Sequence, residues 1–324
     1  MPARLIRNPR PATFLGAPLV EDLAKLDAQV GMLGVPYDYG MLTPGNRQGI
    51  GRQSRGPQAV RNAIVYRYVD LLTGAAAGGR YDVQDDAEYL KGVTMADCGD
   101  VNIIPGADVR ENFDRMTEVA RQIDASGALV AAIGGDHSIS YPISRGMERH
   151  GPIDVVLFDA HADFADELNG SKLSHASNLR RQSELPWVEQ CSMVGLRVVT
   201  KQDYLDAREH GVKIVTSRRL TEIGAERGIA EVMRPGKKVY LSIDVDILDV
   251  GILPDTSYAE PDGITFRLLE QSLWALASRC EIVGFDICEL CGDVPSGSSA
   301  RVTAWILVRL LSAITSQPTW PRRR

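Results

Sequence analysis

The stretch "LFDAHADF", residues 157–164, places two carboxylates and an imidazole directly after an apolar run. If the run is a strand, alternate side chains share a face, so Asp159, His161 and Asp163 point the same way. Two carboxylates and an imidazole crowded at a strand end are unfavourable unless a proton, an arginine or a metal ion lies between them. The stretch therefore predicts a buried strand that ends in a charged functional site.

Similar apolar runs alternate with amphipathic segments along the chain. The runs are "QVGMLGVP" (29–36), "GALVAAIGG" (127–135), "DVVLFDAH" (154–161), "CSMVGLR" (191–197), "VKIV" (212–215), "KVYLSIDVD" (238–246) and "EIVGFDI" (281–287). This alternation is typical of βαβ units around a parallel sheet that is covered on both faces. Since no repeat or low-complexity linker divides the chain, the pattern predicts one α/β domain.

The composition argues against several classes of protein. The chain has 324 residues and a formal net charge of −6, which disfavours general nucleic-acid binding. No apolar run approaches the roughly 18–20 residues that span a bilayer, and the first residues lack the apolar stretch of a secretory signal. Five cysteines in a chain of this length fit a reducing compartment better than a disulfide scaffold. We therefore expect a cytoplasmic protein with neither a membrane nor a nucleic-acid partner.

Three other predicted strands also end in residues that can carry chemistry. "ALVAAI" is followed by His137, "VYLSI" by Asp244 and Asp246, and "IVGF" by a segment that contains Glu289. Because open α/β sheets place ligand sites at the carboxyl ends of their strands, these side chains are expected to gather with those of "DAHAD". The gathered set, without Glu289, contains two imidazoles and four carboxylates.

This set predicts two divalent metal ions. A single zinc ion prefers about four ligands with nitrogen or sulfur donors, so the set is too large and too rich in oxygen for one zinc. Four aspartates and two divalent cations together form a nearly neutral cluster that can be buried. Metal binding lowers the pKa of water from 15.7 to about 7, which makes hydroxide available as a nucleophile.

The motifs resemble those of the ureohydrolase family, which includes arginase, agmatinase and guanidinobutyrase. "GGDHS", "DAHAD", "SIDVDILD" and "GFDICEL" match four signature regions in order, and "GVPYDYG…RQSRGPQAVR" resembles the opening segment. The resemblance implies an arginase-like three-layer α/β/α fold with a mostly parallel eight-stranded sheet. It implies a catalytic domain over residues 29–315, an N-terminal extension over 1–28 and a C-terminal tail over 316–324. It also implies two metal ions, manganese as the usual choice and nickel in some branches, and a trimer or hexamer.

The same resemblance assigns six metal ligands. One ion would be bound by His137 and Asp163 and the other by His161 and Asp246, with Asp159 and Asp244 bridging the two.

Three catalytic roles follow from the resemblance. Asp163 would also accept the proton of the hydroxide, and Glu289 would pair with the guanidinium of a small substrate, whose planar fork suits bidentate contact. His175, in "KLSHASNLRR", aligns with a mobile histidine that delivers a proton to the leaving amine; an ordinary surface histidine is the alternative. The implied reaction is hydrolysis of a C–N bond that releases urea, or a urea derivative, and an amine without an organic cofactor.

Two loops depart from the family pattern and bear on the substrate. Residues 248–265, "LDVGILPDTSYAEPDGIT", replace the usual DPxxAPGTGTPxxGG and bring in Tyr258, Asp255 and Glu260. They predict a narrower and more acidic pocket mouth than that of arginase. Such a mouth favours agmatine, a short alkylguanidine or a biguanide over arginine.

The second loop, "FADELNGSKLSH" (164–175), lacks the polar groups that hold an α-amino acid. Its acids Asp166 and Glu167 would repel a carboxylate unless Lys172 offsets them. This loop also favours substrates without a carboxylate.

Alternative functions remain open at this point. A formiminoglutamate-type hydrolase belongs to the same family, although His175 disfavours it. A partner subunit that assembles with an active paralogue is disfavoured because all six ligand positions are filled. A deacetylase-like enzyme with one zinc would have no use for Asp244 and Asp246 together with His137. Cys288 and Cys291, which flank Glu289, are interpreted as packing residues.

Overall fold

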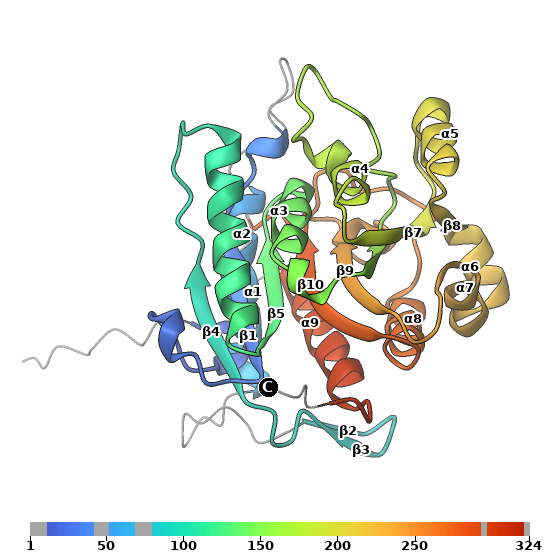
Figure 1. Cartoon of the computed structure of the whole chain (residues 1–324). Helices are drawn as coiled ribbons and strands as arrows, with labels where there is room; N and C mark the ends of the chain where they lie inside the picture. Colours follow the sequence, from blue (N-terminus) through green and yellow to red (C-terminus); the bar gives the residue numbers. More distant parts are fainter. Residues whose placement is uncertain (1–11, 42–51, 69–79, 293–296, 321–324) are drawn as a thin grey trace, which may run out of the picture.

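Eight parallel strands form the centre of the molecule (Figure 1). The computed structural model describes residues 12–41, 52–68, 80–292 and 297–320. In spatial order the strands are β4 (Met95–Asp100), β1 (Val30–Val35), β5 (Leu129–Gly134), β10 (Glu281–Cys288), β9 (Lys238–Asp244), β6 (Ile153–Phe158), β7 (Val188–Leu196) and β8 (Lys213–Thr216). Every neighbouring pair is parallel, which confirms the predicted sheet.

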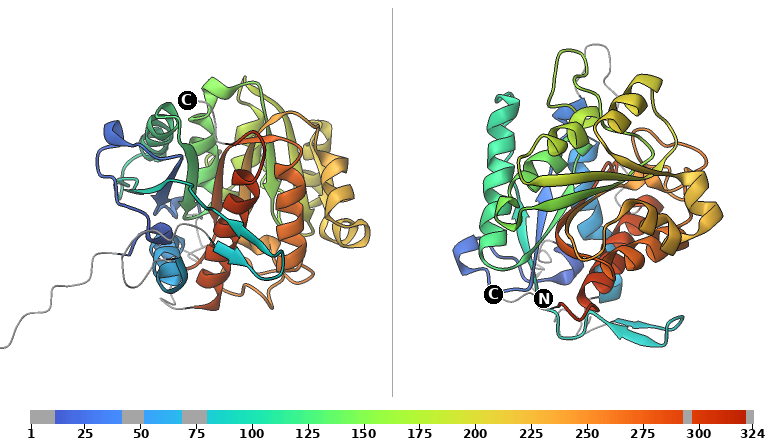
Figure 2. Two further views of the ribbon diagram at one scale, coloured as in Figure 1. Left: turned by 90° about the horizontal axis from the view of Figure 1, so that it is seen from below. Right: turned by 45° about the vertical axis from the view of Figure 1, so that its right-hand side comes forward.

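Helices cover both faces of the sheet, as Figure 2 shows from two sides. One layer consists of α1 (Gly56–Tyr68), α9 (Ser298–Thr315), α8 (Phe266–Ala277), α7 (Ala225–Val232) and α6 (Ser217–Ile223), which contact one another in this order. The other layer contains α2 (Val109–Ala125), α3 (Ser140–Arg145) and α4 (Asn178–Ser183). α5 (Lys201–Glu209) follows β7, and β2 (Arg80–Asp82) and β3 (Ala87–Tyr89) form a separate antiparallel hairpin.

The side chains of the central strands alternate between two apolar cores. In β6, Val156 and Phe158 belong to the cluster that includes α8 and α9, whereas Val155 and Leu157 belong to the cluster that includes α2. A strand that is buried on both faces has no polar face, so its sequence is a continuous apolar run. This arrangement confirms the predicted three-layer α/β/α fold.

Residues before β1 also pack onto the body of the molecule. Phe14 is fully buried, and its N–H donates to an Asp97 carboxylate oxygen of β4 at 2.9 Å. Arg61 of α1 pairs with the same carboxylate, and its guanidinium carbon lies 4.1 Å from the centre of the Phe14 ring. The described part of the N-terminal extension therefore contributes to the core. The basic residues Arg4, Arg7 and Arg10 and the terminal "PRRR", which the sequence predicts to be solvated ends, lie outside the described residues.

The strand order explains why the predicted site residues can meet. β5, β10, β9 and β6 are consecutive neighbours in the sheet, and each one leads into a predicted motif at its carboxyl end. The four motifs therefore lie along one edge of a rigid sheet, where open α/β folds bind ligands. None of the helices in the described ranges has the length and hydropathy needed to cross a membrane.

Candidate active site

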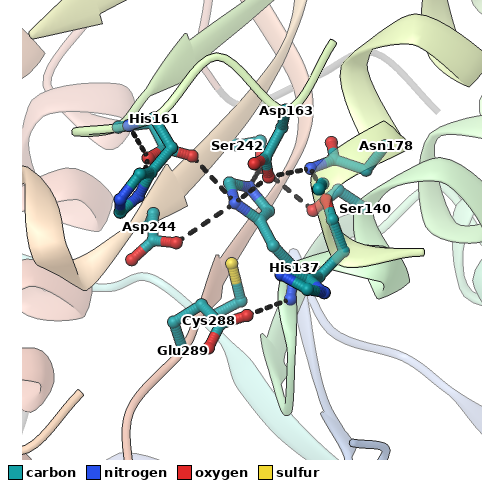
Figure 3. A network of polar contacts seen from close by, with 12 residues as sticks. His137, Ser140, His161, Asp163, Asn178, Ser242, Asp244, Cys288 and Glu289 are labelled. Carbon is teal, nitrogen blue, oxygen red and sulfur yellow. Dashed lines mark hydrogen bonds and ion pairs between the residues drawn. The ribbon is translucent and has the colours of Figure 1, made fainter. Parts of the chain in front are cut away.

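Three carboxylates converge on one nitrogen of His137 (Figure 3). His137 begins the short helix η5 (His137–Ile139) after β5, and its Nδ1 lies 3.0 Å from Asp159 Oδ2, 3.0 Å from Asp163 Oδ2 and 3.2 Å from Asp244 Oδ2. Neither His137 Nδ1 nor Asp159 Oδ2 has a hydrogen-bond partner within the described part of the chain, although both are buried. A buried imidazole nitrogen faced by three carboxylate oxygens fits a bound cation better than a hydrogen bond.

A second group of ligands adjoins the first. His161 Nδ1 lies 2.9 Å from Asp246 Oδ2 and 3.5 Å from Asp159 Oδ1. His137, Asp159 and Asp244 thus form one set of atoms that could hold a metal ion, and Asp159, His161 and Asp246 form another. Asp159 belongs to both sets, as expected of a carboxylate placed between two ions.

The spacing and charge of these atoms fit a pair of divalent cations. Two ligand atoms that each lie about 2.1 Å from an ion, at right angles, are separated by about 3.0 Å. The nearest nitrogen–oxygen distances in the two groups are 3.0 and 2.9 Å. Burial raises the pKa of Asp244 well above its usual value, and the charges of Asp246 and Asp159 raise it further. Cations at this position would remove the unfavourable interaction between the buried carboxylates.

The sequence prediction was wrong about how the residues of "DAHAD" are brought together. β6 ends at Phe158, so Asp159, His161 and Asp163 do not share one face of a strand. Instead Asp159 Oδ1 accepts the His161 N–H at 2.5 Å in a tight turn. Asp163 follows with a φ of 47°, in the left-handed region. An aspartate side chain often bonds to the backbone two residues on and so closes such a turn.

The predicted strand over 238–246 is also too long. β9 ends at Asp244, whose Oδ1 accepts the Asp246 N–H at 2.8 Å. Asp246 Oδ1 in turn accepts the Ala160 N–H at 3.0 Å. The first bond holds the turn after β9, and the second ties that turn to the motif after β6, which fixes the relative positions of the ligands.

A buried polar network orients His137 from behind. Its Nε2 lies 2.9 Å from Ser242 Oγ, and Ser242 Oγ donates to Asp286 Oδ1 at 2.9 Å. Tyr240 and Ser140 donate to the same Asp286 carboxylate. Because the Ser242 proton goes to Asp286, His137 donates from Nε2, which leaves the lone pair of Nδ1 available to bind a metal ion. The sequence carried a signal for this network that was missed: Tyr240 and Ser242 alternate with Asp244 in an otherwise apolar run.

Glu289 lies beside the ligand groups and is held at both oxygens. Its Oε1 accepts the His137 N–H at 2.7 Å, and its Oε2 accepts from Gln53 Nε2 at 3.1 Å. Burial and the charge of Asp136 raise the pKa of Glu289 to about 7. Such a carboxylate favours a cationic ligand, whose charge would stabilise the ionised form. Gln53 lies in the opening segment "RQSRGPQAVR", but the sequence assigned it no role.

His175 and Tyr258 form one wall of the site. His175 begins the short helix η7 (His175–Ser177), and its Nδ1 lies 3.0 Å from the Gly40 carbonyl oxygen. Its ring stacks on Tyr258 with centroids 6.0 Å apart and planes at 11°, while His161 meets Tyr258 edge to face at 5.9 Å. A Nδ1–H that donates to Gly40 leaves Nε2 as the atom that can exchange a proton.

All the predicted site side chains except Asp159 line a cavity of about 440 Å³. The remaining lining is largely apolar, with two further acids: Ala162, Phe164, Ala176, Val198, Val199, Thr200, Asp203, Thr256, Tyr258 and Glu260. Within the described ranges no lysine or arginine lines it. The cavity therefore has an anionic floor and a wall that is apolar and acidic.

Only some of the predicted acids contribute to this wall. Glu260 lines the cavity, but Asp166, Glu167 and Asp255 do not. Asp166 instead pairs with Lys172 at 3.0 Å and with Arg181 at 2.8 Å, so its charge is offset. The other acid of the wall is Asp203, which no sequence motif indicated.

Arg197 holds the loop that follows β9. Its guanidinium donates to the carbonyl oxygens of Asp246 at 2.6 Å, Glu260 at 3.1 Å and Pro261 at 2.8 Å. The loop is thereby fixed against the carboxyl end of β7, which helps to place Glu260 and Tyr258. None of the five cysteines forms a disulfide, and Cys288 and Cys291 are buried.

Comparisons with known proteins agree with this geometry. The family model described as the arginase family matches residues 28–313. The chain is 32% identical over 309 residues to a guanidinopropionase of Pseudomonas aeruginosa, covering 92% of this chain and 90% of that protein. It is 30% identical over 281 residues to an agmatinase of Pyrococcus horikoshii, covering 86% and 89%. A solved structure of proclavaminate amidino hydrolase from Streptomyces clavuligerus superposes with a TM-score of 0.76 at 26% identity, covering 96% and 99%. The chain therefore belongs to the arginase family, the group of metal-dependent amidinohydrolases that its motifs predict.

Proposed function

We propose that this protein hydrolyses a C–N bond of a small guanidino compound and releases urea, or a urea derivative, and an amine. One observation carries the proposal. Glu289, a buried carboxylate, bonds the backbone N–H of His137, while the ring of His137 is in contact with three ligand carboxylates. A guanidinium paired with Glu289 would thus lie next to the metal ligands, in the same cavity.

The six predicted ligands would bind two divalent ions. We propose manganese, with nickel as the alternative. His137 and Asp163 would serve one ion and His161 and Asp246 the other, with Asp159 and Asp244 between them. When bound, such ions lower the pKa of water and supply a hydroxide nucleophile near neutral pH. Asp163, held by Asn178 Nδ2 at 2.5 Å, would accept the proton that the nucleophile releases.

His175 would deliver a proton to the leaving amine. Its ring lines the cavity, and its Nδ1 bond to the Gly40 carbonyl holds the ring in place. His175→Ala should retain both metal ions and lose about 10²- to 10⁴-fold in turnover, the usual range for a general acid. A substrate with a better leaving group should be affected less. Equal losses for good and poor leaving groups would instead indicate that His175 only supports Tyr258, which it stacks against.

The lining favours substrates without a carboxylate. Asp203 and Glu260 would repel an anion, while Val198 and Val199 suit an alkyl chain. Agmatine, short alkylguanidines and biguanides carry the guanidinium for Glu289 and bring no negative charge. We therefore propose these compounds as the substrate class.

A urea-release screen tests this substrate class. Leaving a buried charge unpaired is unfavourable by several kcal/mol, so kcat/KM for agmatine or methylguanidine should exceed that for arginine or 3-guanidinopropionate by about 10²- to 10³-fold. The screen uses manganese-loaded and nickel-loaded protein. Equal rates on arginine and agmatine would refute our interpretation of the lining. Release of formamide from formiminoglutamate would support the alternative hydrolase instead.

The remaining proposals concern assembly and boundaries. We propose a cytoplasmic homotrimer or homohexamer whose catalytic domain spans residues 29–315, by analogy with the family. A hetero-oligomer with a paralogue is the alternative. If the isolated chain binds two metal ions and releases urea, it needs no active partner.

A further inference from the structure

Gln53 is buried directly behind Glu289. It begins the short helix η4 (Gln53–Arg55) and is fully buried. Its Nε2 donates to Glu289 Oε2 at 3.1 Å and to Ser257 Oγ. An amide nitrogen carries two hydrogens, so both are used and the plane of the amide is fixed. The reversed amide would place its oxygen against the Glu289 carboxylate, which is unfavourable.

The two hydrogen bonds to Glu289 use only part of its capacity. Oε1 receives the His137 N–H and Oε2 receives Gln53 Nε2. A carboxylate has about four lone-pair sites, two on each oxygen. Among the described contacts one site on each oxygen therefore remains, and a planar guanidinium needs one N–H acceptor on each oxygen for a bidentate contact. The protein fixes the carboxylate while leaving the pair of sites that such a ligand requires.

We propose that Gln53 is a positioning residue that holds the Glu289 carboxylate in the orientation in which it binds the guanidinium of the substrate. This inference rests on the proposed function, because it takes Glu289 as the guanidinium contact. Gln53 has no exposed surface and is absent from the described lining of the cavity, so it acts through Glu289. Without Gln53, the bond to His137 would be the one described hydrogen bond that still holds the side chain.

The second bond of Gln53 extends this effect to the cavity wall. Ser257 belongs to the loop over 248–265 that departs from the family pattern, and the next residue, Tyr258, lines the cavity. Gln53 therefore connects the carboxylate with the loop that faces the substrate. Ser257→Ala removes this connection but leaves the bond to Glu289, so it should weaken guanidinium binding less than a change of Gln53 does.

Gln53→Met tests the proposal, because methionine has a similar length and no hydrogen-bond donor. A hydrogen bond to a charged group corresponds to about 10- to 100-fold in affinity. The Kd of guanidinium chloride for manganese-loaded protein, measured by calorimetry, should rise by this factor. KM for the hydrolysed guanidine should rise similarly, with a smaller change in kcat. Metal content and Tm should stay near those of the wild type. Gln58→Met is the matched control, since Gln58 is exposed and bonds only Asn62 in the described contacts.

The outcomes separate this inference from the proposed function. If the wild type releases urea and Gln53→Met binds guanidinium as tightly, Gln53 is not a positioning residue and the proposed function stands. If the wild type neither binds guanidinium nor releases urea from any guanidino compound, both proposals fail. If Gln53→Met binds less metal and has a lower Tm, the isosteric Gln53→Glu distinguishes a positioning role from a structural one. Weaker guanidinium binding with full metal content in Gln53→Glu supports the proposal. Renewed metal loss overturns it in favour of a structural role.

Discussion

Asp159→Ala should remove both metal ions and bring urea release below detection. Its Oδ2 lies 3.0 Å from His137 Nδ1 and its Oδ1 lies 3.5 Å from His161 Nδ1, so it contributes to both ligand groups. Asp246 belongs to only one group in the described part of the chain. Elemental analysis after gel filtration should therefore find about zero metal ions per chain in Asp159→Ala and about one in Asp246→Ala, because metal affinity follows ligand count.

Asp244→Ala separates a bridging role from a terminal one. Asp244 Oδ2 faces His137, and its Oδ1 accepts the Asp246 N–H. If Asp244 bridges, its removal should cost more metal than that of Asp246, and essentially all activity. The exposed Asp166→Ala is the control, since its described ion pairs go to exposed Lys172 and to Arg181, which keeps Glu184 as a partner. Full retention of both ions in Asp159→Ala and Asp244→Ala would refute the binuclear assignment.

The sheet could be predicted from the sequence largely because its central strands are buried on both faces. Seven apolar runs correspond to seven of its eight strands. The eighth, β4, has the sequence "MADCGD" and is the last strand of the sheet, with β1 on one side and an isolated bridge to Leu19 on the other. Its two aspartates, Asp97 and Asp100, both form ion pairs with Arg61 of α1. Such pairing permits a polar strand that no hydropathy pattern identifies.

The ligand set could also be predicted, but the contacts that orient it could not. Short motifs indicate chemistry because their residues are close in sequence, as in "DAHAD". The bond between Gln53 and Glu289 joins residues 236 positions apart, and that between His137 and Ser242 joins residues 105 apart. Glutamine and serine are common in many structural roles, so neither residue type marks a site by itself. Only the fold places them behind the functional side chains.

Glu289→Gln should abolish turnover on every guanidino substrate while leaving both metal ions bound. The glutamine keeps the size of the side chain but removes the charge and one of the two acceptors. A buried guanidinium would lose its ion pair, and the bidentate contact that orients it would be lost as well. Together these losses predict a decrease of at least about 10⁴-fold in kcat/KM. Urea release under substrate excess and metal analysis of the same samples measure the two parts of the prediction.

The neighbours of Glu289 make this test specific. In the described residues Glu289 belongs to neither group that shares Asp159, so its change to glutamine removes no ligand. The His137 N–H can still be accepted by the glutamine carbonyl oxygen, whereas the new NH₂ group meets the Nε2 donor of Gln53. The double variant Glu289→Gln with Gln53→Glu restores a donor–acceptor pair there without restoring the charge available to the substrate. It should recover thermal stability and remain inactive. Recovery of turnover in the double variant, or less than a tenfold loss in Glu289→Gln, would show that Glu289 is not the guanidinium contact.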